Sequence, residues 1–416
     1  MADDLGTDKL HAYGEHPKAP HTPNLDALAG RSVLFRNAYA NPVCSPTRAA
    51  LLTGRYGRRT GFGAIVEIAD DAIELPLQEE LIPEVLERSN PAWSSAALGK
   101  WHLSGYKSPS GVKHPNAQGF EHYAGALGNL FYTSTDRRAN WREFEKVVDG
   151  EIRWVDEYAT TDTTNDAVDF LEHHRAGPFF LYVAYNAPHT PFHVPPANLY
   201  EGRIDKKASD IEKFAAVVTA MDTEIGRLLE ALTPEQRATT YVVFVGDNGT
   251  DRAAILPPLD PAHGKLSVFE GGINVPLLVS GPGVRPGETQ ALVHVVDLLP
   301  TIAEAAGAKP RAELDGVSFL DVLADPKRSG RREFVYVERF HPLGGGPFDL
   351  ELQAIRDERY KLIVDKKGRK TLYDLKGRFD DGEGTDASRV KGAERTAVQR
   401  LETELERIER TATYAY

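Results

Sequence analysis

The only cysteine of the chain lies in a segment whose residues could support nucleophilic chemistry. The segment runs from Cys44 to Gly54 with the sequence CSPTRAALLTG. Ser45 suits an N-cap, Pro46 suits a first helical turn and a glycine suits the C-terminal end, so we predict a short helix. Its positive end would favour an anionic nucleophile and an anionic ligand, and Arg48 would add a fixed positive charge. Taken alone, a single cysteine is more often an inert core residue.

Two polar motifs carry the oxygen ligands that a hard divalent cation prefers. Asp3 and Asp4 stand near the start of the numbering, and Asp247 and Asn248 follow the apolar run at 241–245. Carboxylate and amide oxygens bind calcium or magnesium, and ligands at the carboxyl ends of strands fit the usual site of α/β sheets. Each motif also has a simpler interpretation, because the first reads as an acidic terminus and the second as a tight turn.

Three further segments contribute basic side chains. Lys100 and His102 flank a tryptophan, His189 follows the apolar run at 179–185, and Lys265 precedes a glycine-rich turn. Such groups can bind anionic oxygens and can donate a proton to a leaving group. Taken alone, each is more often a solvated lysine or a loop histidine.

Together these motifs resemble those of the type I sulfatases. The segment at Cys44 fits that family's pattern Cys-x-Pro-x-Arg, followed by three residues and Leu-Thr-Gly, and the Gly-Lys-Trp-His block ends at His102. The resemblance implies a hydrolase of sulfate esters in which a formylglycine-generating enzyme oxidises Cys44 to formylglycine. One hydroxyl of the hydrated aldehyde would attack sulfur, and deprotonation of the other would release sulfate.

The same resemblance assigns roles to the other residues. Lys100 and Lys265 would bind the sulfate of a small aryl or sugar sulfate, and His189 would protonate the leaving oxygen. His102 would take the proton from the spare hydroxyl, and Arg48 would orient the hydrated aldehyde. One Ca²⁺, or Mg²⁺ in its place, would have four protein ligands. These are Asp3, Asp4, Asp247 and Asn248.

Two alternatives stay open at this point. Phosphonate monoester and phosphodiester hydrolases of the same superfamily also use a formylglycine beside one metal, although the joint presence of the four basic residues favours sulfate. A catalytically silent sulfate-binding protein on the same scaffold is the second alternative. Its support is that Met1 and Ala2 resemble the end of a first strand that we expect to be missing or clipped. Neighbouring strands would then be unpaired and Asp3 and Asp4 poorly anchored.

The elements that must position these groups are predicted to form an α/β fold. Near-continuous apolar runs at 179–185, 241–245 and 275–279 indicate strands covered on both faces, and a helical pattern lies at 211–232. We expect a mostly parallel central sheet flanked by helices, as in alkaline phosphatase-like proteins, over residues 1–310.

A small C-terminal subdomain is predicted over residues 311–416. Short strand patterns at 333–338, 360–364 and 371–375 alternate with turns, which indicates an antiparallel sheet. A terminal helix follows, with one apolar face. That face is formed by Val398, Leu401, Leu405 and Ile408.

Composition excludes some functions. The formal net charge of -12 argues against nucleic acid as a partner, because binding phosphates needs a basic surface. There is no run of about 18 apolar residues, so no membrane span is predicted. No signal peptide is visible, which leaves the location open, and the resemblance is compatible with a periplasmic or secreted protein. Four more side chains are candidates for the substrate pocket. These are His193, His263, Arg339 and His341.

Overall fold

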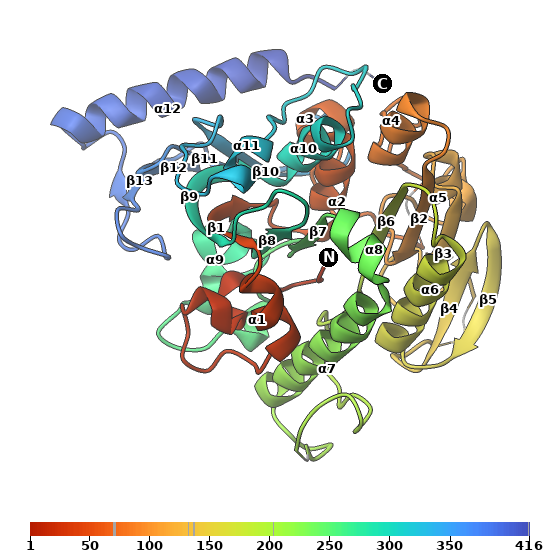
Figure 1. Cartoon of the computed structure of the whole chain (residues 1–416). Helices are drawn as coiled ribbons and strands as arrows, with labels where there is room; N and C mark the ends of the chain where they lie inside the picture. Colours follow the sequence, from red (N-terminus) through yellow and green to blue (C-terminus); the bar gives the residue numbers. More distant parts are fainter. Residues whose placement is uncertain (70–71, 132, 136–137, 203, 415) are drawn as a thin grey trace.

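Strands and helices alternate along most of the chain, and the helices lie outside the strands (Figure 1). The computed structural model describes residues 1–69, 72–131, 133–135, 138–202, 204–414 and 416. Within these ranges, no helix has both the length and the apolar character needed to cross a membrane. Apolar side chains from strands and helices gather in cores between the layers.

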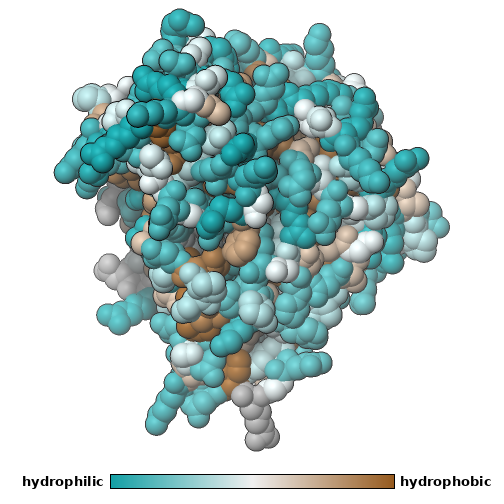
Figure 2. Space-filling model, turned by 90° about the vertical axis from the view of Figure 1, so that its left-hand side faces the viewer, coloured by the Kyte–Doolittle hydropathy of each residue, from teal (hydrophilic) through white to brown (hydrophobic). Residues whose placement is uncertain are grey.

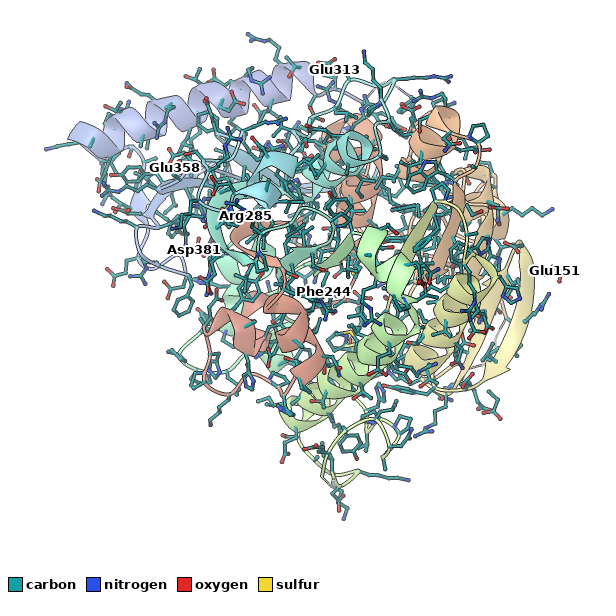
Figure 3. All side chains as sticks on the ribbon, viewed as in Figure 1. Glu151, Phe244, Arg285, Glu313, Glu358 and Asp381 are labelled. Atoms are coloured by element: carbon teal, nitrogen blue, oxygen red, sulfur yellow. The ribbon has the colours of Figure 1, made fainter. Side chains whose placement is uncertain are left out.

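The first sheet has four strands in the order β7–β8–β1–β9. Its members are β1 (Val33–Tyr39), β7 (Val242–Val245), β8 (Leu277–Ser280) and β9 (Gly287–His294). Strand β8 runs antiparallel to both β1 and β7, whereas β9 runs parallel to β1. Phe244 of β7 lies in the middle of the molecule (Figure 3).

The second sheet has five strands in the order β5–β4–β3–β2–β6. Its members are β2 (Ser94–Gly99), β3 (His122–Gly125), β4 (Glu143–Val148), β5 (Glu151–Asp156) and β6 (Phe179–Ala184). Strand β2 runs parallel to β3 and β6, and β4 runs antiparallel to β3 and β5.

The predicted α/β class is confirmed, whereas the expected mostly parallel central sheet is found as two mixed sheets, in which β4 and β8 run antiparallel to their neighbours. The apolar runs at 179–185, 241–245 and 275–279 correspond to β6, β7 and β8. A continuous apolar run indicates that both faces of a strand are covered, and it carries no information about the direction of the strand. Strand β8 therefore looked like its neighbours in the sequence although it runs the opposite way.

The helices of the described ranges cover these sheets. The α-helices before the C-terminal part are α1 (Pro23–Ala29), α2 (Cys44–Thr53), α3 (Gly57–Thr60), α4 (Ile82–Ser89), α5 (His114–Ala117), α6 (Ala159–His173), α7 (Asp210–Ala231), α8 (Pro234–Thr239), α9 (Glu270–Ile273), α10 (Leu298–Ala305) and α11 (Leu320–Ala324). The 3-10 helices are η1 (Thr7–Lys9), η2 (His11–Tyr13), η3 (Gly111–Lys113), η4 (Arg252–Ala254), η5 (Pro261–His263) and η6 (Val295–Asp297).

The long helix α7 fixes the start of α1. Ser209 and Glu212 form a capping box that begins α7. Further along α7, the Asp222 carboxylate accepts the backbone N–H of Asn24 at 3.0 Å and that of Leu25 at 2.7 Å. The first turn of α1 is thus capped by a distant aspartate, and the side chain of the preceding Thr22 makes no capping hydrogen bond.

The C-terminal part contains the predicted antiparallel sheet and terminal helix. The sheet consists of β10 (Val335–His341), β11 (Leu350–Arg356), β12 (Tyr360–Val364), β13 (Lys370–Asp374) and β14 (Thr385–Asp386) in sequential order. Helix α12 (Gly392–Thr411) lies across it and buries all four predicted apolar residues (Figure 1). The face of the molecule on this side is covered mostly by hydrophilic residues (Figure 2). The boundary between residues 310 and 311 stays a prediction.

The first residues of the chain lie between β6 and β7 and pair with both. The Met1 amino group donates to the Val183 carbonyl at 2.8 Å, and the Met1 carbonyl accepts from Tyr185 N at 3.1 Å. On the other side, Ala2 N donates to the Val245 carbonyl at 3.0 Å. Strands β6 and β7 are the edge strands of their sheets, so this short parallel ladder joins the two sheets.

An apolar cavity of about 600 Å³ continues this gap beyond Met1. Its lining includes consecutive residues of the two facing edge strands together with residues of α7 and α10. Burial lowers the pKa of the Met1 amine to about 5, so the position disfavours a charged amine. A neutral peptide N–H would make the same bond to Val183 without that cost.

An added apolar strand is therefore expected to stabilise the fold. We predict that five valine and isoleucine residues placed before Met1 raise Tm by a few °C. Each buried side chain contributes about 1.5–3 kcal/mol, against an ordering cost of about 1.5 kcal/mol per residue, and the backbone gains ladder hydrogen bonds. Calorimetry measures the shift, and a Gly-Ser extension of equal length is the control. Equal Tm values for the two extensions would contradict the prediction.

Candidate active site

Helix α2 begins at Cys44 and is buried along its whole length. The residue that precedes the helix is Val43, so the expectation that Ser45 caps it is wrong. Ser45 instead lies in the first turn, where its Oγ accepts from Val66 N at 3.1 Å. The end of the helix is as predicted, because Gly54 follows it with a φ of 68°.

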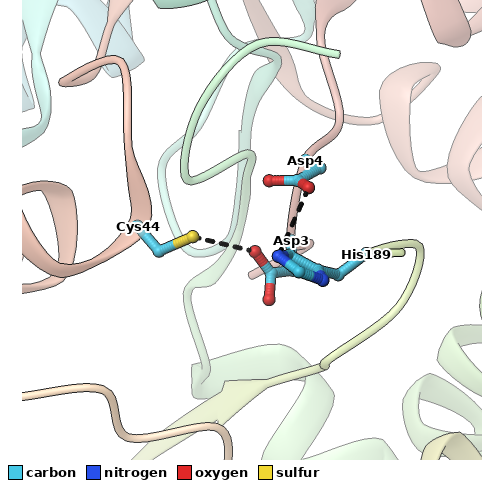
Figure 4. Close-up of side chains that lie close together, drawn as sticks. All are labelled: Asp3, Asp4, Cys44 and His189. Carbon is cyan, nitrogen blue, oxygen red and sulfur yellow. Dashed lines mark hydrogen bonds and ion pairs between the residues drawn. The ribbon is translucent and has the colours of Figure 1, made fainter. Parts of the chain in front are cut away.

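Asp3 links Cys44 to a buried lysine. The Cys44 Sγ donates to Asp3 Oδ1 at 3.3 Å (Figure 4). The second carboxylate oxygen, Oδ2, accepts from Lys100 Nζ at 2.6 Å. All three residues are buried, so the carboxylate and the ammonium form a contact that water does not screen.

Asp4 gathers three other predicted residues around one carboxylate. Its Oδ2 accepts from Lys265 Nζ at 2.7 Å, and its Oδ1 accepts from Asn248 Nδ2 at 2.8 Å. The His189 Nε2 lies 3.7 Å from Oδ2 (Figure 4). The two adjacent aspartates therefore bind different cations from different segments.

Asp247 holds the arginine of the α2 motif. Its Oδ2 accepts from Arg48 Nη2 at 2.8 Å, and its Oδ1 accepts from Asp4 N at 3.0 Å. Arg48 also donates from Nη1 to the Lys100 carbonyl at 2.7 Å. This arginine is fully buried and connects α2 to the ends of both sheets.

The site forms where segments leave the two sheets. Lys100 and His102 follow β2, His189 follows β6, and Asp247 follows β7. The chain start lies between these strand ends, because Asp3 N donates to the carbonyl of Ala187 at 3.0 Å. Main-chain pairing thus brings together side chains that are far apart in the sequence. The expectation that the acidic pair is poorly anchored is wrong.

Three non-glycine residues of this region have left-handed backbone conformations. Their φ angles are 68° for Asp4, 64° for His102 and 75° for Leu266. Such conformations cost on the order of 1–3 kcal/mol each and persist only where surrounding bonds hold them. The bond from Asp4 N to Asp247 is one such restraint, and a 2.8 Å bond from His102 N to the Leu127 carbonyl is another.

Burial and neighbouring charges oppose each other at the carboxylates. Burial alone would raise the pKa of Asp3, but the ammonium group of Lys100 and other cations lower it to about 2. The pKa of Asp4 is likewise raised by burial, but Lys265 and His189 together lower it by more. The pKa of Asp247 is raised, because burial and the charge of Asp3 outweigh the stabilisation from its cations. Asp247 is thus the carboxylate that an added cation would stabilise most.

His102 and Cys44 are both uncharged in this environment. Burial and the nearby cations lower the pKa of His102 well below its ordinary value. Its Nε2 lies 3.2 Å from the Val66 carbonyl, which can only accept, so Nε2 carries the hydrogen. The Nδ1 lone pair is buried and has no hydrogen-bond partner among the described residues. Burial and the charge of Asp3 raise the pKa of the Cys44 thiol, which is therefore protonated at neutral pH.

His189 has its two nitrogens in different surroundings. Its Nδ1 lies 2.7 Å from the Thr190 carbonyl and must donate there. Its Nε2 faces Asp4 and the interior of the site. The nitrogen that can exchange a proton with a ligand is therefore Nε2.

The oxygen donors at this site fit a hard divalent cation. One ligand atom from each of four residues lies within 4.8 Å of the others, and these residues are Asp3, Asp4, Cys44 and His189. The Asn248 Oδ1 is buried and has no hydrogen-bond partner in the described part of the chain. A buried amide oxygen beside carboxylates suits calcium or magnesium. Asp247 is connected to this group because its Oδ1 accepts a hydrogen bond from the backbone N–H of Asp4.

The four pocket candidates have different surroundings. His263 stacks on Phe269 with ring centroids 3.7 Å apart, and Arg339 donates to the Leu266 carbonyl at 2.8 Å. Both thus lie beside the Lys265 segment. His193 stacks on a tryptophan, and burial lowers its pKa to about 4. His341 is exposed and is 3.1 Å from an aspartate. Their contact with a substrate stays a prediction.

Sequence reasoning missed His114, which positions the Lys100–His102 block. Trp101 Nε1 donates to His114 Nδ1 at 2.9 Å, and His114 Nε2 lies 2.8 Å from the Leu75 carbonyl. The histidine thus fixes the buried indole between the two functional side chains. No local pattern in the sequence connects these positions.

Comparisons with known proteins agree with this fold. The sulfatase family profile matches residues 1–308, and a profile described as N-sulphoglucosamine sulphohydrolase, C-terminal, matches residues 262–411. N-acetylgalactosamine-6-sulfatase of Homo sapiens is 33% identical over 371 residues, covering 81% of this chain and 67% of that protein. Arylsulfatase G of Rattus norvegicus is 29% identical over 423 residues, covering 89% and 76%.

Solved structures share the fold. The crystal structure of Ps i-CgsB matches with a TM-score of 0.81 and 29% identity, covering 98% of this chain and 91% of that one. The sulfatase PsFucS1 from Pseudoalteromonas sp. matches with a TM-score of 0.76 at 20% identity, covering 98% and 89%. The chain belongs to the sulfatase family, whose members are sulfuric ester hydrolases.

The backbone at Gly99 gives a test of how strictly the Lys100 segment is held. Gly99 has a φ of 91°, and an added Cβ would lie 2.1 Å from the Ala184 carbonyl oxygen. We predict that Gly99→Ala destabilises the protein by roughly 3 kcal/mol through strain and overpacking, and that it lowers activity by displacing Lys100.

Urea unfolding measures the stability, and Gly14→Ala is the matched control. Gly14 has a φ of 66° but open space around the added Cβ, so only the backbone strain of roughly 1 kcal/mol should appear. Equal losses at the two positions would show that the close contact with Ala184 is unimportant.

Proposed function

We propose that this sulfatase hydrolyses sulfate esters of saccharides, using a formylglycine made from Cys44 and one Ca²⁺ or Mg²⁺ ion. The observation that carries the proposal is the position of Cys44 at the start of a buried helix, hydrogen bonded to Asp3. Around this pair, three buried carboxylates alternate with three buried cations. Such a site can hold an anionic substrate next to an oxygen nucleophile.

The saccharide is inferred from the relatives. One relative at 33% identity is named for N-acetylgalactosamine-6-sulfate chemistry, and Ps i-CgsB, at 29% identity, has been crystallised with k-i-k-neocarrahexaose. Arylsulfatase G is named for aryl substrates, so aryl sulfates are the comparison in any assay.

The unmodified thiol is a poor nucleophile in this position. Its raised pKa leaves it protonated, and it lacks a route by which an attached sulfate could leave. A hydrated aldehyde at residue 44 supplies two hydroxyl groups on one carbon, one for attack and one for release. The neutral Nδ1 of His102 provides a buried lone pair that can accept the proton of the second hydroxyl.

Charge balance explains why a cation and a monoanionic ester belong together here. Three carboxylates, those of Asp3, Asp4 and Asp247, offset the three cations of Arg48, Lys100 and Lys265. A divalent ion adds two positive charges to this neutral set. The sulfate ester brings one negative charge, and an ionised hydroxyl at residue 44 brings the second. A phosphate monoester dianion would leave the site with an excess of negative charge.

The contacts support the remaining proposed roles. Lys100 and Lys265 each contact one of the two aspartates and hold charge where the sulfate oxygens would lie. His189 keeps Nδ1 bound to a carbonyl and directs Nε2 into the site, where it protonates the leaving oxygen. Arg48 is bonded to Asp247 and to the Lys100 carbonyl, and so keeps α2 and residue 44 oriented.

Phosphonate monoesters and phosphodiesters are also monoanions, so charge balance alone does not separate them from sulfate esters. The test is a direct comparison of kcat/KM on sulfated sugars, an aryl sulfate and an aryl phosphonate monoester. We expect the highest value on a sulfated sugar, measured as sulfate release. A preference for the phosphonate would overturn the proposal.

The metal is tested at Asp247. We predict that Asp247→Ala removes both bound calcium and activity, because Asp247 is the carboxylate with the least cationic support. In the unchanged protein, added Ca²⁺ raises Tm as binding stabilises the folded state. Metal analysis and calorimetry measure the two effects, with the exposed Asp156→Ala as control. Full activity after exhaustive chelation would contradict the prediction.

The nucleophile is tested by mass and by turnover. We predict that active protein is about 18 Da lighter than the genetic sequence requires, since conversion to formylglycine replaces sulfur by oxygen and removes two hydrogens. Cys44→Ala should abolish turnover with little change in Tm. Cys44→Ser should allow at most one attack, because a single hydroxyl cannot expel sulfate, and should accumulate as a sulfated ester. Sustained turnover by the serine variant would refute the two-hydroxyl mechanism.

A further inference from the structure

Two arginines from distant segments are anchored on consecutive residues beside the active site. Arg252 Nε donates to the Lys265 carbonyl at 2.9 Å, and Arg339 Nη1 donates to the Leu266 carbonyl at 2.8 Å. Arg252 opens η4, and Arg339 belongs to β10 of the C-terminal sheet. Two separate parts of the chain thus deliver guanidinium groups to the same short loop.

This loop is connected directly to the site. The Lys265 side chain bonds to Asp4, and Leu266 N donates at 2.9 Å to the carbonyl of Pro42, two residues before Cys44. Exposure increases outward, because Lys265 is buried, Arg339 is partly buried and Arg252 is exposed. The arginine pair therefore lies outside Lys265, between the buried site and solvent.

The charges of the two arginines are not offset. Within the described ranges, neither forms an ion pair, whereas the buried Arg48 binds Asp247. Burial lowers the pKa of Arg339, and the positive charge of Arg252 lowers it further. Two guanidinium groups that repel each other without an acidic partner cost free energy, and an anion placed between them would remove that cost.

We propose that Arg252 and Arg339 form a subsite for a second anionic group of the substrate, a sulfate or carboxylate other than the sulfate that is hydrolysed. This inference rests on the proposed function and narrows it to saccharides with at least two negative charges. Each arginine uses one nitrogen for its anchor, which leaves the other nitrogens to donate. Guanidinium groups bind the planar or tetrahedral oxygens of such anions through paired hydrogen bonds.

The anchoring bonds make the subsite rigid. Because both carbonyl acceptors belong to the Lys265–Leu266 segment, the distance from the guanidinium groups to Lys265 is set by the backbone. Leu266 is itself held in a left-handed conformation with φ of 75°. A fixed separation between two anion sites selects a fixed separation between two anionic groups on the sugar.

The experiment compares substrates that differ only in the second charge. The formylglycine-bearing enzyme with bound Ca²⁺ is assayed on a monosulfated disaccharide, on the same disaccharide with a second sulfate, and on a monosulfated disaccharide with a uronic acid carboxylate. The variants are Arg252→Gln, Arg339→Gln and the double variant. Arg153→Gln on the outer strand β5 is the control, because the Arg153 side chain is exposed and bonds to Glu151.

We expect the wild type to favour the doubly charged substrates. The ratio of kcat/KM for doubly to singly charged substrate should fall roughly tenfold or more in the double variant, mainly through KM, since charge-assisted hydrogen bonds are lost. Added salt should reduce the wild-type ratio. Whichever doubly charged substrate shows the larger ratio identifies the anion, and the Arg153 control should keep the wild-type ratio.

Three outcomes would overturn the inference. An unchanged ratio in the double variant would mean that the pair does not bind the second charge. Equal losses of kcat/KM on singly and doubly charged substrates would mean that Arg339 only supports the backbone at Leu266. Because Arg252→Gln changes an exposed residue, it distinguishes this outcome from misfolding. Absence of sulfate release from every substrate by the wild type would overturn the proposed function and this inference with it.

Discussion

The structure depends on a balance between three buried carboxylates and three buried cations at the ends of its strands. Removing one partner from such a set would leave an uncompensated charge in a region without solvent, which is a strongly destabilising change. Each carboxylate binds a cation from another segment, so the ion pairs also connect α2, the loop after β2 and the loop before α9. The chemistry of the site and the assembly of the fold therefore rest on the same contacts.

Main-chain hydrogen bonds hold these charged side chains in fixed positions. Ala2 and Asp3 pair with the ends of β7 and β6, and this pairing sets the two aspartates between the sheets. Asp4 and His102 then have left-handed backbone conformations, which hydrogen bonds from their backbone N–H groups hold in place. The strain of these conformations is offset by a hydrogen-bond network that is complete except at a few atoms. Two of these, Asn248 Oδ1 and His102 Nδ1, are at the positions where ligand chemistry is proposed.

The sequence predicted the residues of the site better than the arrangement of the sheets. Side-chain types at Cys44, Arg48 and Asp247 are dictated by chemistry and occur in compact motifs, so they can be recognised locally. Strand direction depends on which chain segments meet, and the apolar run that forms β8 looks the same in either direction. The N-cap of α2 was misplaced by two residues, because Ser45 bonds to the distant Val66. His114 and Arg252 act through contacts with remote segments, which leave no local signal.

The apolar gap between β6 and β7 has a consequence for how this polypeptide behaves in solution. Beyond Met1, the edge strands β6 and β7 line the apolar cavity with aromatic and aliphatic side chains that carry no charge. Natural sheets protect such edges with charged residues, proline or bulges, and these runs contain none of them. Another chain in an extended state can add to either edge. Such an addition joins two molecules, so it is favoured as the protein concentration rises.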